Sequence, residues 1–220
     1  MHSSTRKTFD EELRELQQDI LKMGGAVDQM MSGAMKALKE RDVDLANKII
    51  DMDDVVDDYN LEIEQSCLRL LALQQPMARD LRMIAAALYI IKDVERMGDY
   101  ALDIAKAAIK LAGKPLFKPL EDLPRMADMV QQMLRESLDS FVNRDIAAIE
   151  KVAADDDAVD ALYRKLRDEL IDFMERDPSL VRQAVELLLI ARYLERIADH
   201  ITNVGERIHY MEVGELRELH

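Results

Sequence analysis

The sequence is poor in residues that break helices and in residues that crosslink chains. Its 220 residues include seven glycines, five prolines, no tryptophan and one cysteine. Alanine, leucine, isoleucine, methionine and charged residues dominate instead, and most of these are good helix formers. We therefore expect an all-α protein. The single cysteine, Cys67, excludes an intrachain disulfide, and its leucine-rich surroundings predict a small buried side chain rather than a reactive thiol.

Positive charge is also scarce. The chain carries 30 Lys and Arg residues against 44 Asp and Glu residues, a net charge of −14 at pH 7. This charge would repel a phosphate backbone, so we expect no nucleic-acid partner. Residues 1–9 lack the apolar core of a signal peptide, and the longest uncharged apolar run, residues 83–91, is too short to cross a bilayer. We expect a cytoplasmic protein that associates with a membrane only indirectly.

Apolar residues recur at spacings of three and four along nearly the whole chain, without the alternation typical of strands. Pro76, Pro178 and two short polar turns interrupt the pattern, since proline opposes continuation of a helix. The pattern predicts helices over residues 9–38, 43–73, 78–111, 121–142, 146–175 and 180–210. Segment 113–120 holds a glycine and two prolines, and we interpret it as the linker between a first domain, 8–112, and a second, 121–213.

The two halves of the chain show an internal duplication. Residues 41–42 match residues 144–145 at an offset of 103. The frame Glu-Arg-x-x-Asp occurs at residues 95–99 and again at residues 195–199, an offset of 100. Each half is then a unit of three long helices joined by short turns, and such helices pack as antiparallel bundles. We predict two tandem antiparallel three-helix bundles.

Each half also carries two pairs of acidic residues at a spacing of four, which places both members on one side of a helix. Like charges at this spacing disfavour an isolated helix, so a hard metal ion is the obvious reason for them. Oxygen donors suit iron, manganese, magnesium or calcium. The candidate ligands are Asp53, Asp57, Glu95, Asp99 and Asp103 in the first half and Asp156, Asp160, Glu195, Asp199 and Asn203 in the second. Because Asn203 stands where the first half has an acid, we expect the second site to be the weaker one.

The proline turns place the acidic pairs of one half at the same level. Pro76 lies 19 residues after Asp57 and 19 residues before Glu95. The same count around Pro178 in the second half gives 18 and 17 residues. Equal distances from a turn bring two antiparallel helices to the same height. Four carboxylates should therefore converge in each half.

Two other interpretations stay open. The acidic residues can be solvated helix faces paired with neighbouring arginines and lysines, in a helical adaptor without metal. A carboxylate-bridged di-metal bundle, as an enzyme or a metal store, also uses such pairs. The sequence has only one Glu-x-x-His frame, at Glu206 and His209, whereas a ferritin-like site needs two.

Two strings carry a family resemblance: QQPMARDLRMI at residues 74–84 and VERMGD at residues 94–99. They resemble the signature of the PhoU family, and the resemblance covers residues 9–210. It implies two tandem three-helix bundles with pseudo-twofold symmetry. It also implies multinuclear clusters of iron or zinc, held by Glu/Asp-x-x-x-Asp motifs that map onto the nine acidic residues named above.

The resemblance further implies a function without catalysis. Members of the PhoU family are accessory regulators of the phosphate-specific ABC transporter, and they repress the phosphate-starvation response. They act between the ATPase subunit of the transporter and a sensor histidine kinase. We thus expect a homodimeric regulator of phosphate homeostasis that works by protein docking. Iron is the expected metal, with zinc, manganese, magnesium and calcium as alternatives.

Overall fold

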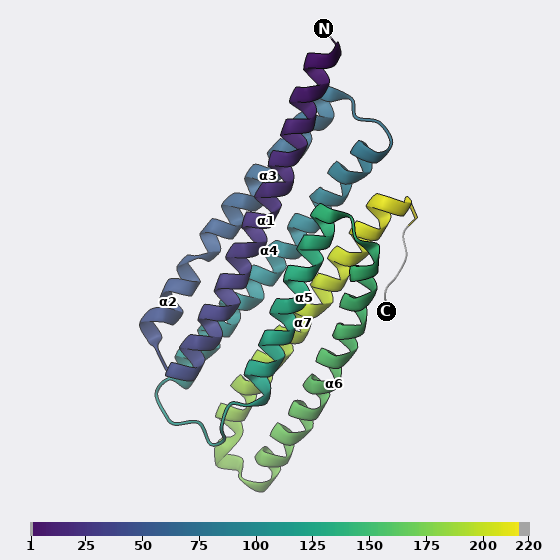
Figure 1. The fold of residues 1–220 in the computed structure, drawn as a ribbon. Coiled ribbons are helices and arrows are strands. Elements are labelled where there is room, and N and C mark those ends of the chain that lie inside the picture. Colours follow the sequence, from purple (N-terminus) through teal and green to yellow (C-terminus); the bar gives the residue numbers. More distant parts are fainter. Residues whose placement is uncertain (1, 216–220) are drawn as a thin grey trace.

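The computed structural model describes residues 2–215 and the side chains of residues 9–215. No residue of that range lies in a β-strand, and long helices account for most of it (Figure 1). The helices are α1 (His2–Glu40), α2 (Val43–Asp51), α3 (Asp53–Gln74), α4 (Arg79–Leu111), α5 (Asp122–Asn143), α6 (Ile146–Arg176) and α7 (Val181–Val213), with a short 3₁₀ helix, η1 (Pro178–Leu180), before α7. The all-α prediction is confirmed.

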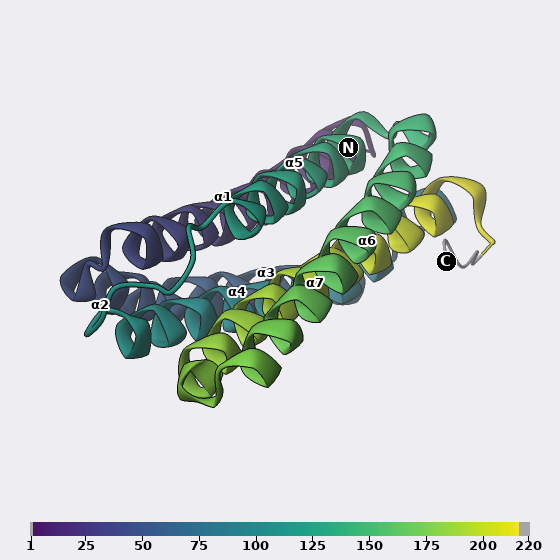
Figure 2. The same ribbon diagram turned by 90° about the horizontal axis from the view of Figure 1, so that it is seen from below.

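Two antiparallel three-helix bundles lie side by side, related by pseudo-twofold symmetry. The first bundle consists of α1, the consecutive helices α2 and α3, and α4, and the second consists of α5, α6 and α7 (Figure 1). Helices α1 and α5 lie together on one side of the molecule, and α4 and α7 lie together on the other (Figure 2). The most extensive packing between any two helices is that of α4 against α7. The two bundles are therefore joined mainly through this central pair.

The single helix expected over residues 43–73 is in fact divided at Met52 into α2 and α3. Met52 keeps helical dihedral angles, with φ −73° and ψ −14°. Asp53 and Asp54 occupy the first turn of α3, where the positive end of the helix dipole favours carboxylates. Aspartate is a weak helix former in a helix interior, so this acidic run suits a new helix start.

The first turn of each bundle repeats the same backbone conformation. Arg41 and Arg144 both take left-handed dihedral angles, with φ of 57° and 61°. Asp42 and Asp145 then cap the following helices, because each side chain accepts a hydrogen bond from a backbone N–H two or three residues later, at 2.9 and 3.0 Å. The duplication seen in the sequence thus extends to the chemistry of the turns.

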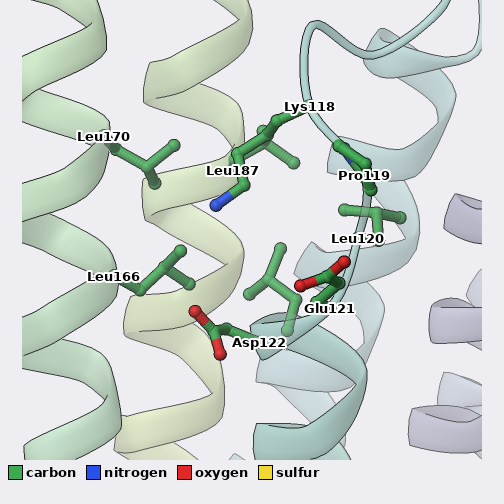
Figure 3. Close-up of a pocket in the computed structure, with 9 residues that line it drawn as sticks. Lys118, Pro119, Leu120, Glu121, Asp122, Leu166, Leu170 and Leu187 are labelled. Atoms are coloured by element: carbon green, nitrogen blue, oxygen red, sulfur yellow. The ribbon is translucent and has the colours of Figure 1, made fainter.

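The linker between the bundles packs onto the second bundle (Figure 3). Lys118 forms an ion pair with Glu169 on α6 at 2.6 Å, and the ring of Phe117 contacts that of Phe173 at 5.0 Å between centroids. The cavity under residues 118–123 has a volume of about 10 Å³, roughly the space of one water molecule. This part of the linker is a packed connection rather than a ligand site.

Apolar side chains of both bundles form a continuous core. Cys67 belongs to it with no exposed surface, and burial raises the pKa of its thiol to about 12. The prediction of a buried side chain at this position is confirmed. No helix within residues 2–215 combines the length and the apolar character needed to span a membrane.

A second contact between the bundles joins α1 to α5. The carboxylate of Asp28 accepts hydrogen bonds from Nε2 of Gln131 at 2.7 Å and from Nε and Nη2 of Arg135 at 3.2 and 3.1 Å. Gln131 is buried, so its amide needs this partner. These bonds hold α5 in one orientation on α1.

Close packing within the first bundle depends on Gly33. A Cβ atom at this position would lie 2.3 Å from Cδ1 and 2.9 Å from Cγ1 of Ile49 on α2. A Cβ atom on Gly25, which is exposed on the same helix, would meet nothing within 4 Å. The two glycines therefore make a matched pair for testing the contact.

We expect Gly25→Ala and Gly33→Ala to change stability in opposite directions. Gly25→Ala should raise the free energy of unfolding by about 0.5–1 kcal/mol, because alanine favours a helix over glycine. Gly33→Ala should lower it by about 1 kcal/mol, because the side chain of Ile49 must leave its packed position to make room for the Cβ atom. Urea denaturation measures both changes. Ile49→Val removes Cδ1, so in that background Gly33→Ala should lower the free energy of unfolding by a smaller amount. An equal increase in the free energy of unfolding for Gly25→Ala and Gly33→Ala would contradict close packing between Gly33 and Ile49.

Candidate metal centre

Helices α3 and α4 supply the acidic residues of the first half. Burial raises the pKa of Glu95 on α4, and the negative charges of Asp99 and Asp57 raise it further. Burial likewise raises the pKa of Asp53 on α3, with additional contributions from Asp57 and Asp99. The carboxylates of the two helices are therefore close enough for their charges to interact across the helix pair. This proximity agrees with the prediction that the acidic pairs, at equal sequence distances from Pro76, lie at the same height on the two helices.

Helices α6 and α7 supply the acidic residues of the second half. The side chain of Glu195 on α7 is only 10% exposed. Burial raises the pKa of Glu195, and the charges of Asp199 on the same helix and of Asp160 on α6 raise it further. Asp156, one helical turn before Asp160, is also buried. The second half thus repeats the arrangement of the first.

Arginines neutralise part of this negative charge. Arg96 donates a hydrogen bond to Asp99 at 2.8 Å, and Arg196 donates to Asp199 at 2.5 Å, each within the repeated frame. Oε1 of Glu195 accepts a hydrogen bond from Arg192. Oε2 of Glu195 is buried and has no hydrogen-bond partner among the described residues. A buried carboxylate oxygen without a partner is unfavourable, so this oxygen is available to a cation.

The carboxylates are neighbours, but they are not gathered around one point. Among the side chains that the structure describes, no group of three or more His, Cys, Asp or Glu residues lies close enough together to hold a metal ion. Gathering the carboxylates around an ion would require changes of side-chain rotamer. The chemistry of the donors, which are carboxylate oxygens in a partly desolvated setting, fits a hard cation.

Asp103 and Asn203 lie at the interface between α4 and α7. The charge of Asp103 contributes to raising the pKa of Tyr193, after the larger effect of burial. Asn203 donates a hydrogen bond from Nδ2 to Oδ1 of Asp93 at 3.2 Å. Positions 93 and 103 correspond to positions 193 and 203 at the duplication offset, so the two contacts are related by the pseudo-twofold symmetry. These two predicted ligands therefore face the other bundle, and among the described side chains neither interacts with the carboxylates of its own set in the way that Glu95 and Asp57 do.

Sequence reasoning missed a polar cluster at the same interface. Nδ1 of His200 lies 2.8 Å from Oδ1 of Asp93. The ring of Tyr100 contacts the rings of His200 and Tyr193 at centroid distances of 5.8 and 5.9 Å. Tyr100 and His200 occupy matching positions of the duplication, and they line a surface pocket of about 450 Å³. The matching positions of Tyr100 and His200 in the two halves could have indicated this cluster, but neither residue belongs to a recognised motif.

Two tandem three-helix bundles, each with its own set of carboxylates, place the chain among all-helical proteins built by internal duplication. The family model of the PhoU domain matches the chain twice, over residues 20–108 and 123–208, once in each bundle. The chain belongs to the PhoU family, as the resemblance in its sequence predicts.

Relatives match the chain over nearly its full length. A protein of Clostridium acetobutylicum named phosphate-specific transport system accessory protein PhoU homolog is 39% identical over 216 residues, which cover 98% of this chain and 99% of the relative. The crystal structure of PhoU from Pseudomonas aeruginosa has a TM-score of 0.90 at 33% identity, covering 94% of this chain and 100% of the other. The phosphate transport system regulatory protein PhoU from Streptococcus pneumoniae has a TM-score of 0.89 at 36% identity, covering 95% and 99%.

The raised pKa of Glu195 predicts how stability depends on pH. Burial raises the pKa of Glu195, and a carboxyl group whose pKa is raised in the folded state disfavours folding once it ionises. The effect disappears at a pH below the pKa of glutamate in the unfolded chain, about 4.3, because the group is then protonated in both states. Glu195→Gln should therefore stabilise the metal-free protein at pH 7 by up to about 1 kcal/mol, and the gain should vanish below about pH 4.

Thermal unfolding over a pH series tests this expectation. Glu62→Gln, at an exposed position of α3, is the matched control and should change the melting temperature little at any pH. Destabilisation by Glu195→Gln at pH 7 would show instead that the ion pair with Arg192 outweighs the cost of burial.

Proposed function

We propose that the protein is a cytoplasmic regulator of phosphate homeostasis that limits phosphate uptake and represses the phosphate-starvation response. It would couple the ATPase subunit of a phosphate ABC transporter to a sensor histidine kinase. The observation that carries the proposal is the match of both bundles to the PhoU domain, together with full-length relatives named as accessory and regulatory proteins of phosphate transport. The proposal includes no catalytic step.

Metal binding is the second part of the proposal. Iron is the first choice, with zinc, manganese, magnesium and calcium as alternatives. The raised pKa values of Glu95 and Glu195 support it, because a nearby cation would favour their ionised forms. Asp103 and Asn203 would contribute from the α4–α7 side. The principal ligands would be Asp53, Asp57, Glu95 and Asp99 in the first bundle and Asp156, Asp160, Glu195 and Asp199 in the second.

Protein docking would transmit the signal. An ion held between α3 and α4, or between α6 and α7, would fix the two helices relative to each other near the protein surface. The net charge of −14 would favour partners with basic patches. A homodimer would present such a surface twice.

We expect protein purified without chelators to contain at least about one metal ion per chain by elemental analysis. Glu95→Ala and Glu195→Ala should each lower the metal content, because each removes a carboxylate from one set. Glu62→Ala, on the exposed face of α3, should leave it unchanged. On titration with a chelator, the bundle that contains Asn203 should lose its metal first. A metal-free wild-type protein, or equal content in all variants, would rule out this part of the proposal.

Deletion of the gene should derepress phosphate-starvation genes in phosphate-rich medium, as measured with a transcriptional reporter. The wild-type chain and Glu62→Ala should restore repression. The double variant Glu95→Ala/Glu195→Ala should fail to restore it although the protein accumulates, since both carboxylate sets are impaired. Unchanged reporter expression after deletion would count against the regulatory role.

A further inference from the structure

The end of α4 and the start of α7 together form a surface pocket of about 620 Å³. Its volume falls within the range of about 300–1,000 Å³ that ligand pockets span. Both bundles contribute to it, and its segments lie at the lower end of the molecule in Figure 1. The lining residues are Lys110, Leu111, Gly113 and Lys114 from the first half and Val181, Arg182, Gln183, Val185 and Glu186 from α7.

Part of the lining is apolar and exposed. Val181 and Val185 lie one helical turn apart on α7, and each is 39% exposed. Leu111 beside them is buried. Ala184 and Leu187 are the buried residues of the same turns, so the two valines lie outside the hydrophobic core. An apolar side chain of a partner could cover them.

The rim of the pocket is basic, although the chain as a whole is strongly acidic. Lys110 is neutralised by Glu186, whose two carboxylate oxygens both lie 3.2 Å from its Nζ. Lys114 and Arg182 form no ion pair with any other described residue. The four charged residues of the lining therefore carry a net positive charge that the protein leaves unbalanced.

The wall of the pocket is held in place before any partner binds. Oε1 of Gln183 accepts a hydrogen bond from the backbone N–H of Phe117 at 2.8 Å, and its Nε2 donates to the carbonyl of Pro115 at 3.1 Å. These bonds tie the start of the linker to α7. A pre-organised pocket loses less conformational entropy when a partner binds.

We propose that this pocket docks an acidic segment of a partner protein through one apolar anchor residue. The valines would contact the anchor, and Lys114 and Arg182 would attract the flanking carboxylates. A small anion alone would leave the valines exposed, and recognition of an anionic membrane takes a larger basic cluster. The pocket shares no residue with the carboxylate sets, so the inference goes beyond the proposed function and does not depend on metal.

Fluorescence anisotropy with the full chain tests the inference. The probe is a short fluorescein-labelled peptide with one central leucine flanked by glutamates. It should bind, and its affinity should fall as salt is added, because screening weakens attraction between exposed charges. The same peptide with lysines in place of the glutamates should bind at least about tenfold more weakly. Equal binding of the two peptides would overturn the proposal.

Surface variants locate the binding site. Lys114→Glu/Arg182→Glu should weaken binding of the glutamate peptide about tenfold, and Val181→Ser/Val185→Ser should also weaken it. Lys36→Glu/Arg69→Glu, at exposed positions on α1 and α3, changes the net charge by the same amount and should leave affinity within about twofold. Equal losses in the two charge-reversal variants would show a net-charge effect and overturn the proposal. If a charge reversal lowers the melting temperature, Lys114→Gln/Arg182→Gln replaces it.

Two further outcomes would assign the pocket to another occupant. Displacement of the peptide by millimolar inorganic phosphate would show an anion site without an apolar anchor. Dissociation of a dimer by Lys114→Glu/Arg182→Glu, seen by light scattering, would show that a second copy of the chain fills the pocket. Either result would overturn the proposal but leave the reporter test of the regulatory role unaffected.

Discussion

The packing of α4 against α7 is the contact on which the rest of the structure depends. Each helix has 33 residues, and each also packs against the other helices of its own bundle. A helix surrounded in this way must be apolar over much of its surface, so charge is confined to the edges of the apolar stripe. Glu95 and Glu195 are partly desolvated there, which is why burial is the main cause of their raised pKa values. The packing of α4 and α7 within their own bundles, against α3 and α6, therefore completes the partly desolvated setting of the carboxylates.

The carboxylates influence how the helices of each pair interact. Like charges on α3 and α4 repel each other in the absence of a cation, and the same holds for α6 and α7. A cation placed between the helices of either pair would convert repulsion into attraction, at a point far from the turns that connect them.

The pseudo-twofold symmetry is broken where the bundles meet. Asp93 accepts hydrogen bonds on one side of the α4–α7 interface, whereas the matching position on the other side holds Tyr193. Tyr100 likewise faces His200, its own counterpart in the duplication. An interface with a charged hydrogen-bond network on one side and aromatic contacts on the other gives the two halves different surroundings. The replacement of Asp103 by Asn203 in the second half is part of the same asymmetry, and it is the reason for expecting a lower metal affinity there.

The helical class, most helix ranges, the duplication and the level of the acidic pairs could be predicted from the sequence, because they follow from local periodicity and from counting residues away from prolines. The division of the helix expected over residues 43–73 at Met52 could not. The metal ligands and the domain boundaries 8–112 and 121–213 remain predictions. The hydrogen bond between Asn203 and Asp93 and the pocket shared by Lys114 and Arg182 could be recognised only in the folded structure. The reason is that the two members of each pair come from segments far apart in the sequence. Their approach depends on how α4 rotates and slides against α7, which side-chain packing decides and no local pattern encodes.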